Sequence, residues 1–306
     1  MISIPFDVPM TAQLSRTLMD ELARTYPFIR KELLATTAFG RPIETLVIGT
    51  GSRRVLYAAA FHANEWITAP VLLRFAADYA DAIENEGTIF DRDARTLATE
   101  ATIYLVPMVN PDGVDLVTGV IRQEDPEYDR AMDLARNYPN IPFPNGWKAN
   151  LNGTDLNLSF PAGWLRAREI KFAQGYTRPG PRDYVGRAPL DQIESLSIFD
   201  YTIRVNPDLV IALHSQGNVI YWRYGGIEIP GARELGEEFA AVSGYELAET
   251  PTNSSFAGYK DWFIQRFRKP GYTVEVGSGT NPLPLSQLKA IYPRTMKILV
   301  RGAEAP

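Results

Sequence analysis

The chain of 306 residues contains two histidines, and each directly follows an apolar segment of strand length. His62 follows residues 57–61, and His214 follows residues 209–213. Open α/β sheets bind their ligands at the carboxyl ends of the strands. Two imidazoles that separate strands carry to that edge can converge on one point, so this pair is the first candidate for chemistry.

Glu65 lies three residues after His62, where the pattern changes from strand to helix. Residues three apart lie on the same side of a helical turn, so both side chains can face one ion. Two histidines and a glutamate form a known catalytic zinc set that leaves a position for water. We therefore predict one Zn²⁺ per chain, bound by His62, Glu65 and His214. The spacing alone leaves another interpretation open, in which His62 only begins a helix and His214 packs in the core.

A zinc hydrolase also needs a group that accepts a proton from the attacking water. Glu275 lies inside the otherwise apolar segment 272–276. A carboxylate in such a segment is costly to bury unless another group pairs with it. We predict that Glu275 is the general base; the alternative is a glutamate on an edge strand that faces solvent.

Composition excludes several classes of protein. The net charge of −5 and the lack of a basic run argue against nucleic-acid binding. The chain has no cysteine, which excludes disulfides, thiolate ligands and a cysteine nucleophile. The N-terminal residues lack the pattern of a signal peptide, and no apolar stretch approaches the ~18 residues that span a bilayer. We expect a cytoplasmic protein that does not bind membranes; the oligomeric state stays open.

Alternating strand and helix patterns predict one α/β domain over residues 1–306, with a mostly parallel sheet covered on both faces. Helices are predicted at 11–24, 65–83, 195–205, 233–242 and 285–300, and strands at 43–48, 55–61, 102–109, 209–213, 219–224 and 272–276. Residues 110–113 read as a turn. Residues 137–189, rich in Pro, Gly, Asn and aromatics, are predicted to form an ordered, irregular and functional segment.

Five short segments, taken together and in order, resemble the zinc metallocarboxypeptidase family. They are His62-Ala-Asn-Glu65-Trp66, Asn110-Pro-Asp-Gly113, Gly153-Thr-Asp-Leu-Asn157, His214-Ser-Gln and Val274-Glu-Val-Gly277, and they span about residues 40–279. The resemblance implies a single α/β domain with a mixed, largely parallel sheet of about eight strands and helices on both faces. It also implies zinc ligation by His62, Glu65 and His214, and the role of base for Glu275.

Two further roles follow from the resemblance. Asp155 matches the aspartate that hydrogen-bonds the first ligand histidine and so fixes its tautomer. Lys148 falls near the family's arginine that stabilises the tetrahedral oxyanion, and a lysine supplies that charge without a bidentate fork. The alternative for Lys148 is a solvated loop lysine.

The sequence departs from the family where carboxypeptidases hold the terminal carboxylate of the substrate. The family's asparagine–arginine pair reads Asn157-Leu158 here, and Asn64 replaces the arginine between the first two ligands. The usual clamp therefore cannot form, although Asn157 is expected to contact substrate. Tyr259, just before an Asp-Trp pair, is the candidate for the tyrosine that closes over the substrate.

One branch of the family shares these departures, namely the bacterial γ-D-glutamyl-diaminopimelate peptidases, which cut peptidoglycan stem peptides. Residues 147–150, 156–161, 175–180 and 214–222 look like that branch. The resemblance implies zinc-dependent hydrolysis of the γ-D-glutamyl-diamino acid bond in a peptidoglycan-derived peptide. Four arginines are candidates to bind its carboxylates, or else lie on the surface: Arg178, Arg182, Arg187 and Arg223.

Two other functions remain open. The first is an ordinary zinc carboxypeptidase that removes C-terminal residues from peptides. The second is a catalytically silent module that kept the fold and binds muropeptides. The presence of all three ligands and of the base favours an enzyme.

Overall fold

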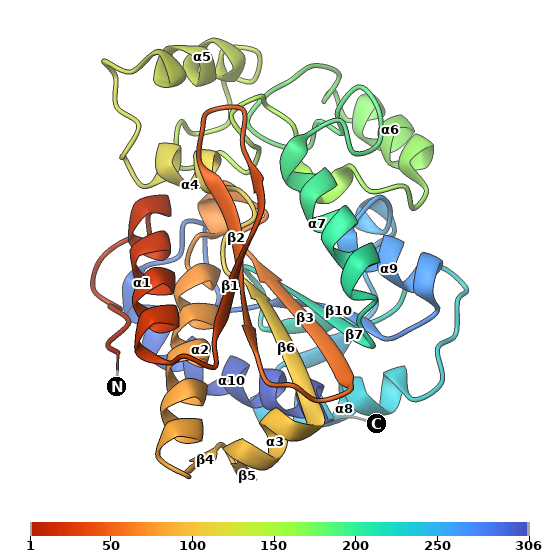
Figure 1. Ribbon diagram of the computed structural model, residues 1–306. Helices are drawn as coiled ribbons and strands as arrows, with labels where there is room; N and C mark the ends of the chain where they lie inside the picture. Colours follow the sequence, from red (N-terminus) through yellow and green to blue (C-terminus); the bar gives the residue numbers. More distant parts are fainter. Residues whose placement is uncertain (1, 305–306) are drawn as a thin grey trace.

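A mixed sheet of eight strands runs through the computed structural model, which describes residues 2–304 (Figure 1). Four central strands, β6, β3, β7 and β10, run parallel, and the strands beside them, β2 and β8, run antiparallel to them. In spatial order the strands are β1 (Arg30–Thr36), β2 (Pro42–Ile48), β6 (Ala101–Val106), β3 (Arg53–Ala59), β7 (Leu209–His214), β10 (Gly271–Glu275), β8 (Val219–Tyr221) and β9 (Glu246–Ala248). This confirms the predicted α/β fold.

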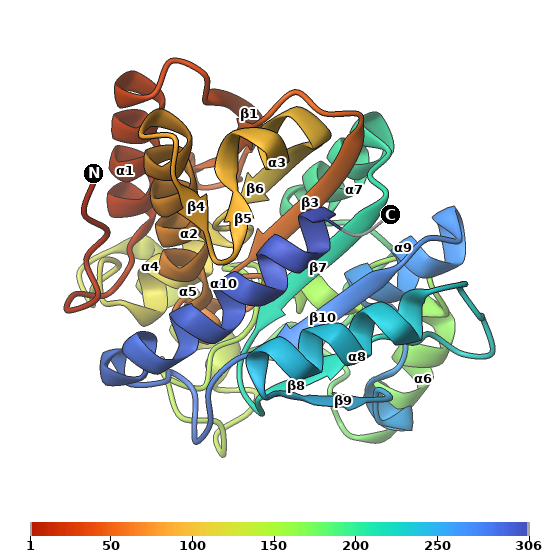
Figure 2. The same cartoon turned by 90° about the horizontal axis from the view of Figure 1, so that it is seen from below.

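Helices cover both faces of the sheet. On one face α1, α2, α8 and α10 pack together, and Figure 2 shows α8 and α10 side by side. On the other face α7 contacts β1, and α9 contacts β7 and β10. The helices are α1 (Ala12–Thr25), α2 (Thr68–Glu84), α3 (Ala94–Glu100), α4 (Pro111–Val117), α5 (Pro126–Ala135), α6 (Trp164–Ala173), α7 (Ile193–Val205), α8 (Ala232–Ser243), α9 (Tyr259–Phe267) and α10 (Leu288–Glu304).

Short elements complete the fold. Strands β4 (Thr88–Ile89) and β5 (Arg92–Asp93) form a small hairpin after α2. Four 3₁₀ turns are η1 (Ala63–Glu65), η2 (Leu156–Leu158), η3 (Thr252–Ser254) and η4 (Leu285–Gln287) within residues 2–304. The described residues form one domain, and the ends of the predicted domain, residues 1, 305 and 306, lie outside them.

The central strands are apolar throughout because both of their faces are buried. Along β3, Val55 and Tyr57 contribute to the core under α1, α2, α8 and α10, whereas Leu56 and Ala58 contribute to the core under α7 and α9. Parallel strands held in this way bring their carboxyl ends to one edge, where the functional residues follow.

Several elements differ from the sequence prediction. Residues 110–113 do not form an isolated turn: the side chain of Asn110 accepts the N–H of Gly113 at 3.1 Å and caps α4. Strand β1 was not predicted because none of the residues in this edge strand is buried and its exposure does not alternate. Helix α5, at 126–135, was also missed.

Helix α6 lies inside the segment predicted to be irregular. Its buried residues, Trp164, Ala167 and Lys171, do recur at helical spacing. The lysine hides that pattern because a charged residue stands where an apolar one is expected. The rest of the segment is irregular and ordered, as predicted.

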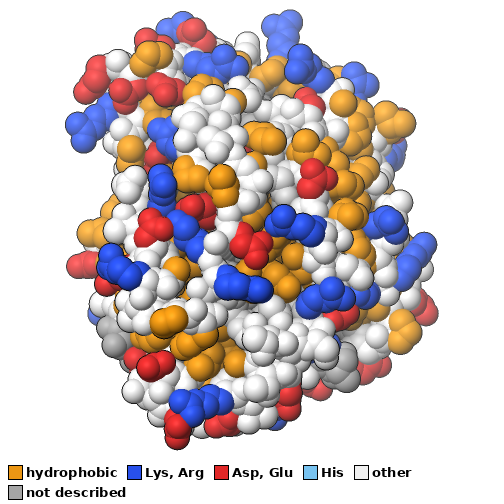
Figure 3. Space-filling view, viewed as in Figure 1, with side chains coloured by type: hydrophobic (Ala, Val, Ile, Leu, Met, Phe, Trp, Pro, Cys, Tyr) orange, Lys and Arg blue, Asp and Glu red, His pale blue; other side chains and the backbone are white. Residues whose placement is uncertain are grey.

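Charged side chains of both signs are mixed on the face seen in Figure 3. Lys and Arg side chains lie interspersed with Asp and Glu there, without a continuous basic patch. Within residues 2–304, none of the helices has both the length and the apolar character needed to cross a bilayer.

Candidate active site

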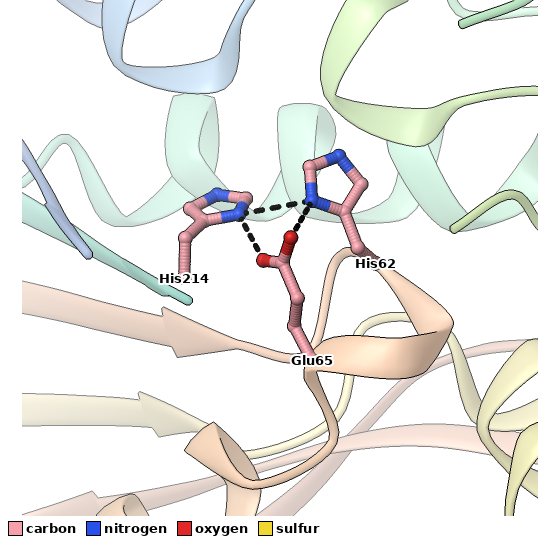
Figure 4. A group of neighbouring side chains, drawn as sticks. All are labelled: His62, Glu65 and His214. Carbon is pink, nitrogen blue, oxygen red and sulfur yellow. Dashed lines mark hydrogen bonds and ion pairs between the residues drawn. The ribbon is translucent and has the colours of Figure 1, made fainter. Parts of the chain in front are cut away.

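Three buried side chains converge at the carboxyl edge of the sheet (Figure 4). His214 ends β7, whereas His62 and Glu65 lie where the chain leaves β3 and passes through η1. Since β3 and β7 are neighbouring parallel strands, their carboxyl ends lie side by side. Nδ1 of His62 lies 2.9 Å from Oε1 of Glu65, Nδ1 of His214 lies 2.9 Å from Oε2 of Glu65, and the two Nδ1 atoms are 3.2 Å apart.

This set of donors fits a zinc ion. Ligand atoms of the three residues lie within 4.8 Å of one another, and two imidazole nitrogens with a carboxylate are a common catalytic zinc set. Burial lowers the pKa of His214 although Glu65 acts to raise it, so this imidazole is held in the neutral form that binds metal. Burial acts to raise the pKa of Glu65, but the charges of His62 and Lys148 outweigh it and hold that pKa well below its usual range.

Asp155 orients His62. Nε2 of His62 lies 3.0 Å from Oδ1 of Asp155. The same Oδ1 accepts the backbone N–H of Asn157, and Oδ2 accepts the backbone N–H of Asp183, each at 3.2 Å. Burial acts to lower the pKa of His62, but the carboxylates of Glu65 and Asp155 outweigh it and raise that pKa to about 9. The contact directs the Nε2 proton toward Asp155 and turns Nδ1 toward the ligand cluster.

Glu275 is the last residue of β10 and the strand partner of His214. Burial raises the pKa of Glu275, and the charge of Glu65 raises it further. The charges of Lys148 and His62 act to lower this pKa, but the result is a pKa of about 8. A carboxylate whose pKa lies near neutrality is suited to accept and return a proton. Glu275 is half-buried, whereas the four residues before it in β10 are buried.

Lys148 lies against the ligand cluster from a neighbouring loop. Its Nζ atom is 2.6 Å from Oε1 of Glu65. Burial acts to lower the pKa of Lys148, but Glu65 outweighs it and the pKa is raised, so the ammonium stays charged. The carbonyl oxygen of Lys148 accepts the N–H of Ala63 at 3.0 Å, which ties this loop to η1. The structure therefore excludes the alternative of a solvated loop lysine.

Two cavities meet at this point. The smaller, of about 230 Å³, is lined by His62, Asp155 and Asn157, and the larger, of about 850 Å³, by Asn64 and Ser215 among others. Residues that line both cavities mark their boundary: Lys148, Arg182, Tyr221 and Glu275. A substrate that crosses this boundary places a bond beside the carboxylate of Glu275 and has space on either side.

The predicted role of Tyr259 as a side chain that closes over the substrate is wrong. Tyr259 is fully buried in the core under α7 and α9, and its hydroxyl is hydrogen-bonded to Oγ1 of Thr202 at 2.8 Å. Its backbone N–H instead donates to Oδ1 of Asn157 at 2.9 Å. That bond orients the amide of Asn157, whose Nδ2 lies 3.4 Å from Nε2 of His214.

Two predicted substrate-binding arginines lie elsewhere. The side chain of Arg223 is paired with Glu249 at 2.7 Å. Arg178 is exposed, and its backbone meets the hydroxyl of a tyrosine. Of the arginines among residues 2–304, only Arg182 lines the two cavities. Sequence reasoning named four arginines but had no signal that separated this one from the others.

Two Lys–Asp pairs in the wall of the smaller cavity were missed from the sequence. They are Lys171–Asp183 and Lys260–Asp261, each with a nitrogen–oxygen distance of 2.5 Å. The side chains of the second pair are 4% and 3% exposed. The available signal was a charged pair between apolar residues, with Tyr259 before it and Trp262 directly after it.

The fold and this centre define a zinc metallopeptidase. A family model described as zinc carboxypeptidase matches residues 16–297, and the chain belongs to that family. A γ-D-glutamyl-L-diamino acid endopeptidase of Lysinibacillus sphaericus is 44% identical over 282 residues, which cover 92% of this chain and 69% of that protein.

Solved structures show the same fold at low sequence identity. Carboxypeptidase A from Helicoverpa armigera superposes with a TM-score of 0.72 at 19% identity, over 98% of this chain and 75% of that chain. The murein-tripeptide amidase MpaA from Escherichia coli O157 gives a TM-score of 0.55 at 18% identity, over 89% of this chain and 91% of that chain. The resemblance drawn from the five sequence segments is thereby confirmed at the level of family and fold.

Proposed function

We propose that this protein hydrolyses the amide bond between γ-D-glutamate and a diamino acid in peptides derived from peptidoglycan. The observation that carries the proposal is the position of Glu275 at the boundary of two cavities, next to the cluster of His62, Glu65 and His214. The 44% identity to an endopeptidase named for this bond supports the choice of substrate.

The zinc ligands, Glu275 and Lys148 have separate roles in the reaction. A zinc ion, when bound by His62, Glu65 and His214, supplies a Lewis acid that activates water and polarises the scissile carbonyl. Glu275 accepts a proton from the attacking water and returns it to the leaving amine. The ammonium of Lys148 stabilises the negative charge that develops on the carbonyl oxygen.

The substrate's carboxylates need partners other than the family's clamp. Asn64 donates its side-chain N–H to the carbonyl oxygen of Asn145 at 3.0 Å, and Leu158 offers only an apolar wall to the smaller cavity. Arg182 is the guanidinium that remains at the boundary of the cavities. We assign carboxylate binding to Arg182 in place of Arg178 and Arg223.

Space on both sides of Glu275 supports action within a longer peptide as well as at its end. The ordinary carboxypeptidase is the second candidate, favoured by the shared fold, but the missing arginines speak against it. A silent binding module is disfavoured because the ligands, the base and the cation of Lys148 all meet in one place.

The proposal is tested with the peptide L-alanyl-γ-D-glutamyl-meso-diaminopimelate. We expect mass spectrometry to show release of diaminopimelate by the zinc-loaded protein. A chelator should stop the release, and zinc should restore it. Peptide that stays intact with stoichiometric zinc bound would refute the proposed function.

A further inference from the structure

One oxygen of Glu65 is hydrogen-bonded to the backbone just beyond the second ligand histidine. Oε1 of Glu65 faces Nδ1 of His62 at 2.9 Å and Nζ of Lys148 at 2.6 Å. Oε2 faces Nδ1 of His214 at 2.9 Å (Figure 4) and accepts the N–H of Ser215 at 3.2 Å. Apart from the histidines, each oxygen thus has one donor, an ammonium on Oε1 and a backbone N–H on Oε2. These two donors fix the orientation of the carboxylate between the histidines.

Ser215 is itself held by the side chain of Asn281. The hydroxyl of Ser215 donates to Oδ1 of Asn281 at 2.8 Å, and Nδ2 of Asn281 donates to the carbonyl oxygen of Ser215 at 2.7 Å. A carbonyl oxygen only accepts, so it requires the amide nitrogen and fixes which way the amide of Asn281 points. Ser215 is 2% exposed, so bulk water has little access to it. Loss of Asn281 would therefore leave polar groups of Ser215 short of partners.

The backbone ladder holds the residues on either side of Ser215. The N–H of Val276 donates to the carbonyl oxygen of His214, and the N–H of Gly217 donates to the carbonyl oxygen of Gly277, each at 2.8 Å. Among residues 2–304, the hydrogen bonds of Ser215 itself go to Glu65 and to Asn281. The direction of the Ser215 N–H therefore depends on Asn281.

A second amide holds the loop between β10 and η4 without reaching the metal site. Oε1 of Gln287 accepts the N–H of Ser278 at 3.1 Å, and Nε2 of Gln287 donates to the carbonyl oxygen of Ser278 at 2.7 Å. Gln287 thus makes two hydrogen bonds to one serine, as Asn281 does. The two amides differ in what their serine contacts, which makes Gln287 a matched control.

We propose that Asn281 is a positioning residue of the metal site, which holds Ser215 so that the N–H of Ser215 orients the carboxylate of Glu65. Glu65 keeps its orientation because both of its oxygens have a donor, and Asn281 fixes the second donor. This inference concerns zinc binding and does not depend on which peptide is cleaved. It can therefore fail while the proposed substrate stands.

The first test measures the dissociation constant for zinc by competition with a chelator. Asn281→Ala should weaken zinc binding about tenfold, the low end of the range for residues behind a metal ligand, because its effect passes through Ser215. Ser215→Ala removes the hydroxyl and leaves the hydrogen bond to the carbonyl oxygen, so it should weaken zinc binding less. Gln287→Ala should leave the dissociation constant unchanged.

The second test uses the protein loaded with Co²⁺, whose visible spectrum depends on the geometry of its ligands. Asn281→Ala should change this spectrum, whereas Gln287→Ala should not. A hydrogen-bonded amide that only stabilises the fold would lower the melting temperature in both variants and change neither spectrum, and that result would contradict the inference.

Zinc affinity that is unchanged in Asn281→Ala would overturn the assigned role. An equal loss of affinity in Asn281→Ala and Gln287→Ala would also overturn it, because the effect would then come from the loop as a whole. Asn281 and Ser215 also line the larger cavity. A higher KM for the γ-D-glutamyl peptide in Asn281→Ala, with zinc affinity unchanged, would make Asn281 a substrate contact instead of a positioning residue.

Discussion

Glu275 and His214 are directly opposite each other on the parallel strands β10 and β7. The N–H of Val276 donates to the carbonyl oxygen of His214 at 2.8 Å, so the pairing continues just past both residues. The assigned base and one metal ligand are therefore held by the backbone ladder of the sheet. Side chains on rigid elements keep their relative positions better than side chains on loops.

The role of Glu275 predicts a loss of rate without a loss of metal. Glu275→Gln keeps the shape of the side chain but cannot accept a proton, so kcat should fall by at least ~10²-fold. Zinc content, measured by atomic absorption, should be unchanged, because Glu275 is not among the ligands. Near-normal turnover of this variant would mean that the base lies elsewhere.

Substitution of a zinc ligand should instead lower the zinc content of the protein. His62→Ala and His214→Ala should each lose zinc, because removal of one imidazole leaves two protein donors. Glu65→Ala should also weaken zinc affinity, which distinguishes Glu65 from Glu275. A variant that retains one zinc per chain would remove the substituted residue from the ligand set.

Asp155 should act through His62 and not on the substrate. Asp155→Asn keeps a hydrogen-bond acceptor but loses the charge that fixes the imidazole, and metal affinity should fall ~10- to 100-fold. Competition with a chelator measures this change. An unaltered dissociation constant for zinc would show that the contact at 3.0 Å is structural only.

Glu194, which is not a metal ligand, should make the free energy of unfolding depend on pH. Burial raises its pKa from 4.5 to about 7, although hydrogen bonds from its own backbone and from Asn150 act to lower it. One oxygen of Glu194, Oε2, has no hydrogen-bond partner among residues 2–304. The folded protein thus favours the protonated acid, and the stability associated with it is lost as pH rises through the folded pKa.

Glu194→Gln should cancel this loss, because glutamine stays neutral. Relative to the wild type, the variant should gain roughly 2 to 3 kcal/mol in the free energy of unfolding between about pH 5 and pH 8. Urea unfolding at the two pH values measures the difference. A difference that does not change with pH would contradict the assigned pKa.

Sequence reasoning located the metal ligands because its signals were local. His62, Glu65 and His214 stand beside apolar strands, and strands with both faces buried have a clear pattern. The order of motifs along the chain then identified the family. Glu275 was found in the same way, as a charge inside an apolar strand.

The substrate-binding residues could not be found in this way. Whether a tyrosine or an arginine faces a cavity depends on tertiary packing. Tyr259, the first residue of α9, points into the core, and Arg223 pairs with Glu249. Lys171 was hidden because it stands on the buried side of α6. The sequence likewise does not show that Lys260 in α9 is buried and paired with Asp261, because a buried ion pair and a solvated charge look the same there.

The most direct test of the account compares two substrates on the zinc-loaded protein. We expect kcat/KM for L-alanyl-γ-D-glutamyl-meso-diaminopimelate to exceed that for hippuryl-phenylalanine, since Asn64 and Leu158 replace the arginines that would hold the carboxylate of the latter. Hippuryl-arginine should be an equally poor substrate. Efficient turnover of either hippuryl compound, with none of the γ-D-glutamyl peptide, would contradict the central claim.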